Sequence, residues 1–139
     1  MSIQKTFPGR YESLEEIASF IRGEAEKIGL PNTDVFAVET AVDEAVSNII
    51  EHAYEGVENG TIEITCETDP ESIKIILIDN GKPFDPQSIP SPDLKAPLNK
   101  RKEHGLGLYL MQKWMDEVRF EFCEECNRLV LIKRKAKSN

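Results

Sequence analysis

Two polar residues of different chemistry lie on one face of a predicted helix. Glu44 and Asn48 are four residues apart, which places a carboxylate and an amide one helical turn from each other on the same face. Ala37 and Ala41 share that arc, so small side chains leave room for another molecule to approach. An ordinary solvated helix face also fits this pattern, and the pair by itself does not separate the two interpretations.

Two glycine-containing segments farther along the chain add to this pair. Asp79-Asn80-Gly81 follows an apolar run. Its acid can accept a hydrogen bond from an exocyclic amine, while the glycine lets a flat ring approach the backbone. The second segment, HGLGL at 104–108, opens a predicted helix, where glycines let backbone N–H groups surround an anion.

Each glycine segment also has a simpler interpretation. The first fits a plain turn, and glycines at a helix start are common. Because no predicted strand precedes residues 104–108, that segment matches neither the dinucleotide-binding nor the P-loop pattern.

The spacing of apolar residues predicts the helices that position these groups. Apolar side chains recur at helical spacing over 14–25 and 35–53, and the same spacing resumes after Gly107. The carboxylate and amide therefore belong to the second helix, and the second glycine segment stands at the start of the third.

The remaining apolar runs predict strands. A short strand precedes the first helix, residues 62–66 alternate, and residues 73–78 are almost continuously apolar, as in a central strand covered on both faces. Two further strands join near 124–127. This order predicts an α+β fold, a two-layer α/β sandwich in which one mixed, mostly antiparallel sheet carries about three helices on one face.

Residues 80–103 are unlike the rest of the chain. They contain five prolines and few large apolar residues, and they end in charged residues. Long irregular segments within compact domains are usually functional or disordered. Neither a repeat nor a long linker divides the sequence, so we expect a single domain over residues 1–139.

Composition excludes several classes of function. The formal net charge is −8 and the isoelectric point is about 4.8, which disfavours direct binding of nucleic acid or of an anionic membrane. The start of the chain lacks the apolar stretch of a signal peptide, and no apolar run approaches the ~20 residues that span a bilayer.

The cysteines bear on the cellular compartment. Three cysteines, an odd number, fit a reducing cytosol, and we expect a cytoplasmic protein. Cys123 and Cys126 form a C-x-x-C pair that is open to a metal or redox interpretation. However, structural zinc usually needs four ligands, and the simpler interpretation is two cysteines flanking a hairpin turn.

The order and spacing of the three polar features resemble a known superfamily. An E-x-x-x-N helix, a D-x-G after a strand and a G-L-G-L before a helix are similar to the N, G1 and G2 boxes of the Bergerat-fold (GHKL) ATPases, which include gyrase B, Hsp90, histidine kinases and MutL. Within them, the chain resembles the bacterial anti-sigma-factor serine kinases over nearly its whole length. The resembling segments are 41–54, 79–86, 105–111 and 115–118.

The resemblance implies bound ATP and Mg²⁺, and it carries a role to each matching residue. Asp79 would bind the adenine amino group while Gly81 keeps the base pocket open. Asn48 would ligate Mg²⁺, whose preference for oxygen suits an amide. Phe84 and His104 also fall in the implied nucleotide site. The second glycine box would hold the phosphates through Gly105, Leu106, Gly107 and Leu108.

The resemblance further implies a catalytic carboxylate and a lid cation. Glu44 would accept the proton of the attacking hydroxyl or orient that hydroxyl. The ATP lid corresponds to about 82–103, in which Lys100, Arg101 or Lys102 would reach the β- and γ-phosphates. The sequence does not separate these adjacent bases, and we take Arg101 as the catalytic candidate. Such a constellation supplies the positioning and charge neutralisation that phosphoryl transfer requires.

One departure from the family lies in the last hairpin. The family commonly carries a Gly-Thr-Thr-type turn there, whose hydroxyl supports the adenine site. Residues 126–130 of this chain read CNRLV, so a water molecule or Asn127 would have to substitute.

The function implied by the resemblance is that of a serine/threonine protein kinase acting as an anti-sigma factor. Such a protein phosphorylates a small antagonist protein and sequesters a sigma factor. The alternative is a non-catalytic partner-switch module that uses ATP to order its lid. The family also implies a homodimer, which no residue in the sequence demonstrates.

Overall fold

The computed structural model describes residues 1–54, 60–82, 103–123 and 126–136, with the side chains at 52, 103–108 and 122–123 outside the description. The elements, in chain order, are β1 (Ser2–Pro8), the 3-10 turn η1 (Tyr11–Ser13), α1 (Leu14–Lys27), α2 (Asn32–Asn48), the π-helical turn η2 (Ile49–Ala53), β2 (Thr61–Asp69), β3 (Ser72–Asp79), α3 (Glu103–Trp114), β4 (Glu117–Cys123) and β5 (Cys126–Arg134).

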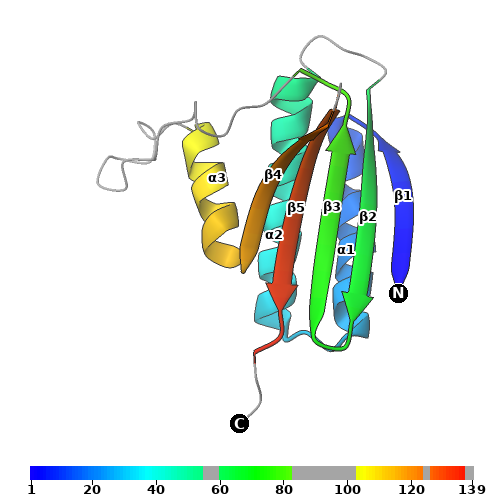
Figure 1. Cartoon of the computed structure of the whole chain (residues 1–139), viewed down its shortest axis with the longest axis vertical. Coiled ribbons are helices and arrows are strands. Elements are labelled where there is room, and N and C mark those ends of the chain that lie inside the picture. Colours follow the sequence, from blue (N-terminus) through cyan, green and yellow to red (C-terminus); the bar gives the residue numbers. More distant parts are fainter. Residues whose placement is uncertain (55–59, 83–102, 124–125, 137–139) are drawn as a thin grey trace.

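The five strands form one sheet in the order β1-β2-β3-β5-β4. Every neighbouring pair is antiparallel, and the three α-helices lie on the same side of the sheet (Figure 1). The predicted α+β, two-layer architecture is therefore confirmed. Because β5 lies between β3 and β4, the last hairpin is placed directly beside the end of β3.

The core forms between the inner face of the sheet and the helices. Side chains at alternate positions of β2 and β3 are at most 1% exposed, and they join apolar residues of α1 and α2 in one cluster. Period-two alternation in the strands and 3.6-residue spacing in the helices bring these two apolar surfaces together. In the middle of this layer, α2 packs against both α1 and α3.

Two packing expectations are wrong. Helices cover β3 on one face, not on two, yet Ile76 on the other face is only 6% exposed and its partner in register, Val130, is fully buried. Flanking strands and the aliphatic stems of long polar side chains can shield such positions without a second layer. Ala37 and Ala41 are also buried, so the space beside them is filled by packing and is not open to a ligand.

The third helix begins at Glu103, one residue before the segment 104–108 that was expected to open it. Gly105 and Gly107 lie within its first turns, which the helix tolerates because a glycine lowers helix propensity by only ~1 kcal/mol relative to alanine. Among the described helices, none is long and apolar enough to cross a membrane.

Candidate functional site

A cleft near the end of β3 is lined by residues of α2, η2, α3, β3, β4 and β5. Figure 1 shows how these elements are arranged. The cavity volume of the cleft is about 40 Å³, well below the ~300–1,000 Å³ of typical small-molecule sites. The exposed surface of the lining is mostly apolar, although five of the eleven lining residues are polar or charged. The lining residues are Ala45, Asn48, Ile49, Ala53, Asp79, Met111, Phe120, Glu121, Asn127, Arg128 and Leu129.

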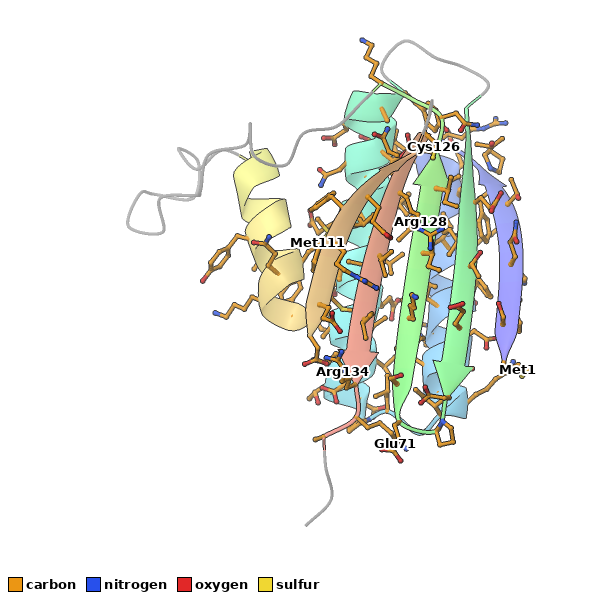
Figure 2. The ribbon with its side chains drawn as sticks, viewed as in Figure 1. Met1, Glu71, Met111, Cys126, Arg128 and Arg134 are labelled. Carbon is orange, nitrogen blue, oxygen red and sulfur yellow. The ribbon has the colours of Figure 1, made fainter. Side chains whose placement is uncertain are left out.

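The predicted helix pair is only partly in this cleft. Asn48 lines it beside Ala45 and Ile49, whereas Glu44 is half-buried one turn earlier on α2 and does not line it. Met111 of α3 (labelled in Figure 2), which is 1% exposed, also lines the cleft. The structure therefore brings Asn48 and Asp79 to one cleft and leaves Glu44 outside the lining.

Asp79 is the buried acid of the cleft. It is 4% exposed, and its Oδ1 atom accepts hydrogen bonds from the Gly81 backbone N–H and from Asn127 Nδ2, each at 2.9 Å. Burial raises the pKa of this carboxyl above its usual value, while the two hydrogen bonds oppose the shift. A buried acceptor of this kind, facing a mostly apolar cleft, suits a flat base with one exocyclic amine.

Gly81 also has a packing reason that the sequence did not indicate. A Cβ atom at this position would stand 2.5 Å from the carbonyl carbon of Ala53 and closer still to its oxygen. The Lys82 N–H donates to that same Ala53 oxygen at 2.9 Å. The glycine is thus needed because the loop after β3 docks on the last turn of η2, and Gly81 does not itself line the cleft.

The π-helical turn η2 is what brings the helix end to this loop. In η2 the Tyr54 N–H donates to the Ile49 oxygen, the i→i−5 pattern of a π-turn, and such turns are frequent at functional sites. The Tyr54 hydroxyl accepts the Asn80 N–H at 3.0 Å and donates to the Thr61 carbonyl oxygen. Tyr54, which is 5% exposed, therefore ties the end of α2 to the end of β3 and the start of β2.

Other predicted site residues lie outside the described part of the chain. Phe84, Lys100 and Arg101 fall in 83–102, as does nearly all of the predicted lid, and the side chains of 103–108 are likewise outside it. For the second glycine box, His104, Gly105, Leu106, Gly107 and Leu108, the structure gives the backbone assignment to α3.

The C-x-x-C pair flanks the turn of the last hairpin. Cys123 at the end of β4 pairs in register with Cys126 at the start of β5, and Figure 2 shows Cys126 at the end of the sheet that carries the cleft. Cys126 is disulfide-bonded. Cys66 is a free, buried thiol, and burial raises its pKa to about 12.

Local sequence patterns did not indicate how Ala53 and Tyr54 support the site. Both contact a loop more than 25 residues away in sequence, as in the Asn80–Tyr54 hydrogen bond. For Asn127 the sequence indicated only a replacement for a missing threonine; its contact with Asp79 follows from strand register, and its contact with the Lys82 carbonyl follows from the position of the loop after β3.

A one-sided antiparallel sheet, with three helices on one face and a cleft between α2, α3 and the last hairpin, is the architecture of the histidine kinase-like ATPase domains. The family described as histidine kinase-like ATPase domain matches residues 7–133, and the chain belongs to this family. Among its relatives are proteins named serine-protein kinase RsbW. The RsbW of Halalkalibacterium halodurans is 31% identical over 121 residues, covering 84% of this chain and 74% of that protein. The RsbW of Bacillus cereus strain B4264 is 32% identical over 120 residues, with the same coverage.

Solved structures share the fold. The RsbU and RsbW domains of a Mycobacterium tuberculosis protein match with a TM-score of 0.69 at 18% identity, covering 96% of this chain and 32% of that one. This chain thus spans about a third of that longer protein. The nucleotide-free catalytic domain of histidine kinase ThkA matches with a TM-score of 0.57 at 20% identity, covering 96% of both chains. These likenesses extend the family assignment to the three-dimensional architecture.

Proposed function

We propose that this protein is an ATP-dependent serine-protein kinase that takes the adenine base into the cleft beside Asp79. The observation that carries the proposal is a buried carboxylate at the end of β3 in an otherwise mostly apolar cleft. The kinase assignment follows the RsbW serine-protein kinases to which the chain is related.

Asn48 is the proposed Mg²⁺ ligand. Its amide lines the cleft together with Asp79, and an amide oxygen suits a hard cation that also binds phosphate oxygens and water. The described residues hold no group of three or more His, Cys, Asp or Glu side chains that could bind a metal ion by themselves. A site completed mainly by the nucleotide fits this donor set. The metal would neutralise charge on the transferring phosphoryl group.

We assign phosphoryl transfer to Glu44, to the basic residues at 100–102 and to the backbone of 105–108. Glu44, one turn before Asn48 on α2, accepts or orients the hydroxyl proton of the incoming serine. Arg101, or its neighbours Lys100 and Lys102, reaches the β- and γ-phosphates, and the backbone of 105–108 holds them. Phe84, Gly81 and His104 complete the nucleotide surroundings in this proposal.

The proposed protein substrate is a small anti-sigma-factor antagonist, and the proposed target of inhibition is a sigma factor. The relationship to RsbW supports a bacterial partner switch of this kind. The competing function is a module that binds ATP and partners without transferring phosphate. The carboxylate at Glu44, retained one turn from Asn48, favours the kinase.

Transfer of labelled phosphate separates these two functions. Purified protein is incubated with γ-labelled ATP, millimolar Mg²⁺ and the antagonist-like protein encoded nearest to its gene, and ATP affinity is measured in parallel. We expect label on a serine of the second protein, and none with Asp79→Asn. ATP binding without transfer of phosphate would favour the non-catalytic module over the kinase. The absence of ATP binding would refute both functions.

A further inference from the structure

The two oxygen atoms of the Asp79 carboxylate are used differently. Oδ1 accepts both hydrogen bonds, from the Gly81 N–H and from Asn127 Nδ2. Among the described residues, no hydrogen bond is made to Oδ2, although the side chain is 96% buried and lines the cleft. One oxygen is therefore committed to the protein, and the other is available to a donor on a ligand.

The side-chain amide of Asn127 contributes one of the two hydrogen bonds to Oδ1. Its Nδ2 atom donates one hydrogen to Asp79 Oδ1 at 2.9 Å and the other to the Lys82 carbonyl oxygen, also at 2.9 Å. A threonine hydroxyl at this position carries one hydrogen and could not donate to both acceptors at once. The amide thus joins the base-recognising acid to the loop that leaves β3.

Strand register fixes where this amide stands. Asp79 and Asn127 are directly paired across β3 and β5, both point to the helix side of the sheet, and Asn127 is 8% exposed. The Asp79–Asn127 contact is consequently part of the sheet, whereas the adjoining Lys82 carbonyl belongs to the loop docked on Ala53. The orientation of the Asp79 carboxylate is therefore set from within the sheet, by the paired strands β3 and β5.

We propose that Asn127 is a positioning residue that holds Asp79 with Oδ2 toward the cleft, so that the site selects a purine with an exocyclic amine over a 6-oxo purine. This inference rests on the proposed function, because it assigns the specificity of the same nucleotide site. It concerns the orientation of Asp79 and assigns Asn127 no direct contact with the nucleotide.

The physical basis is the freedom of a carboxylate about its last torsion. That torsion is broad and roughly two-fold, so a carboxylate without the Asn127 amide can turn away from the ligand or share its oxygens unevenly. Adenine presents a donor at position 6, and hypoxanthine presents an acceptor there. The donor of hypoxanthine is N1–H and not a group at position 6. Loss of an alignment that fits a donor at position 6 therefore weakens ATP binding strongly, while ITP, whose position 6 cannot donate to Oδ2, is affected less.

The test compares ATP and ITP affinities, with Mg²⁺, for the full chain and three variants. In Asn127→Leu we expect about 10- to 100-fold weaker ATP binding, the loss of a hydrogen bond to a charged group, with ITP affinity changed by about threefold or less. Asn127→Thr, which restores one donor, should recover most of the ATP preference. Glu117→Gln is the matched control: Glu117 lies on the same hairpin, pairs with Arg134 at its opposite end, and should leave the ratio unchanged.

Equal loss of ATP and ITP affinity in Asn127→Leu would show a structural role only and overturn the inference. An unchanged ratio with the threonine variant no better than leucine would do the same. Should the leucine variant fail to fold, Asn127→Ala carries the same expectation without added bulk. If the wild-type chain binds no ATP, the proposed function itself fails. If it binds ATP and the ratio does not respond to position 127, only the inference fails.

Discussion

Substitution of Gly81 by alanine tests the way the cleft is assembled. The new Cβ would stand 2.5 Å from both the carbonyl carbon and the Cβ of Ala53, whereas carbon atoms in contact are normally ~3.5–4.0 Å apart. Most of the crowding is against backbone, which cannot turn away as a flexible side chain can. Either the loop after β3 or the η2 turn must move, and the Lys82–Ala53 hydrogen bond at 2.9 Å is lost with that movement.

The expected cost follows from these two effects. Overpacking of a closely packed position costs about 1–3 kcal/mol, and a backbone hydrogen bond contributes about 1 kcal/mol net. We therefore expect the free energy of unfolding to fall by about 2–4 kcal/mol. With an m-value of about 2 kcal/mol per molar urea for a small domain, the urea midpoint should drop by about 1–2 M.

Gly23→Ala is the matched control for this measurement. Nothing lies within 4 Å of a Cβ at Gly23, which is in the interior of α1. Alanine there should stabilise the protein by about 0.5–1 kcal/mol through helix propensity. Urea denaturation followed by circular dichroism, together with ATP affinity, is measured for both variants. An unchanged midpoint for Gly81→Ala with weakened ATP binding would refute the docking argument and favour a glycine that serves the base alone.

Further predictions concern Glu44 and Asn48 on α2, the buried acid Asp79, and the Tyr54 hydroxyl. Glu44→Gln should keep ATP affinity within about twofold and lose phosphate transfer by 10²–10⁴-fold; equal transfer rates would remove Glu44 from catalysis. Asn48→Ala should abolish the Mg²⁺ dependence of nucleotide binding, measured by titration with and without the metal, and full retention would exclude the metal role. Because burial raises the pKa of Asp79 from 3.8, the folded state binds the proton more tightly, so stability present at low pH is lost as pH rises through the folded pKa. Asp79→Asn should remove this loss and be at least as stable as wild type at pH 7, without binding ATP; urea midpoints between pH 4 and 7 decide this. Tyr54→Phe removes a buried hydroxyl that makes two hydrogen bonds, and should lower the free energy of unfolding by about 1–3 kcal/mol. Tyr11→Phe, at a half-exposed ring, should lower it much less.

Sequence periodicity alone determined most of the architecture. Apolar spacing over 35–53 identified the helix that carries Glu44 and Asn48, and alternating or continuous apolar runs identified β2, β3 and β5. These patterns are local, since a side chain's face is set by its own element's repeat. For the same reason the order of the three glycine and polar boxes was enough to indicate the superfamily.

Boundaries and faces were less predictable. Apolar spacing alone marked the third helix only after Gly107, whereas the glycine segment at 104–108 indicated its start to within one residue of Glu103. The open face of β3 was missed because Ile76 and Val130 are buried there without a covering helix. An apolar run predicts that its side chains are buried, but it does not predict which element covers them.

The tertiary structure decided how the cleft is built. Gly81 is required by Ala53, 28 positions earlier, and Asp79 is oriented by Asn127, 48 positions later. Both contacts depend on strand register and on the π-turn that ends α2, and neither is encoded in the spacing of neighbouring residues. The sequence by itself determined which residues carry the chemistry. Only the packing of distant segments determined which oxygen of Asp79 accepts the hydrogen bonds of Gly81 and Asn127, because these groups meet only when the sheet closes.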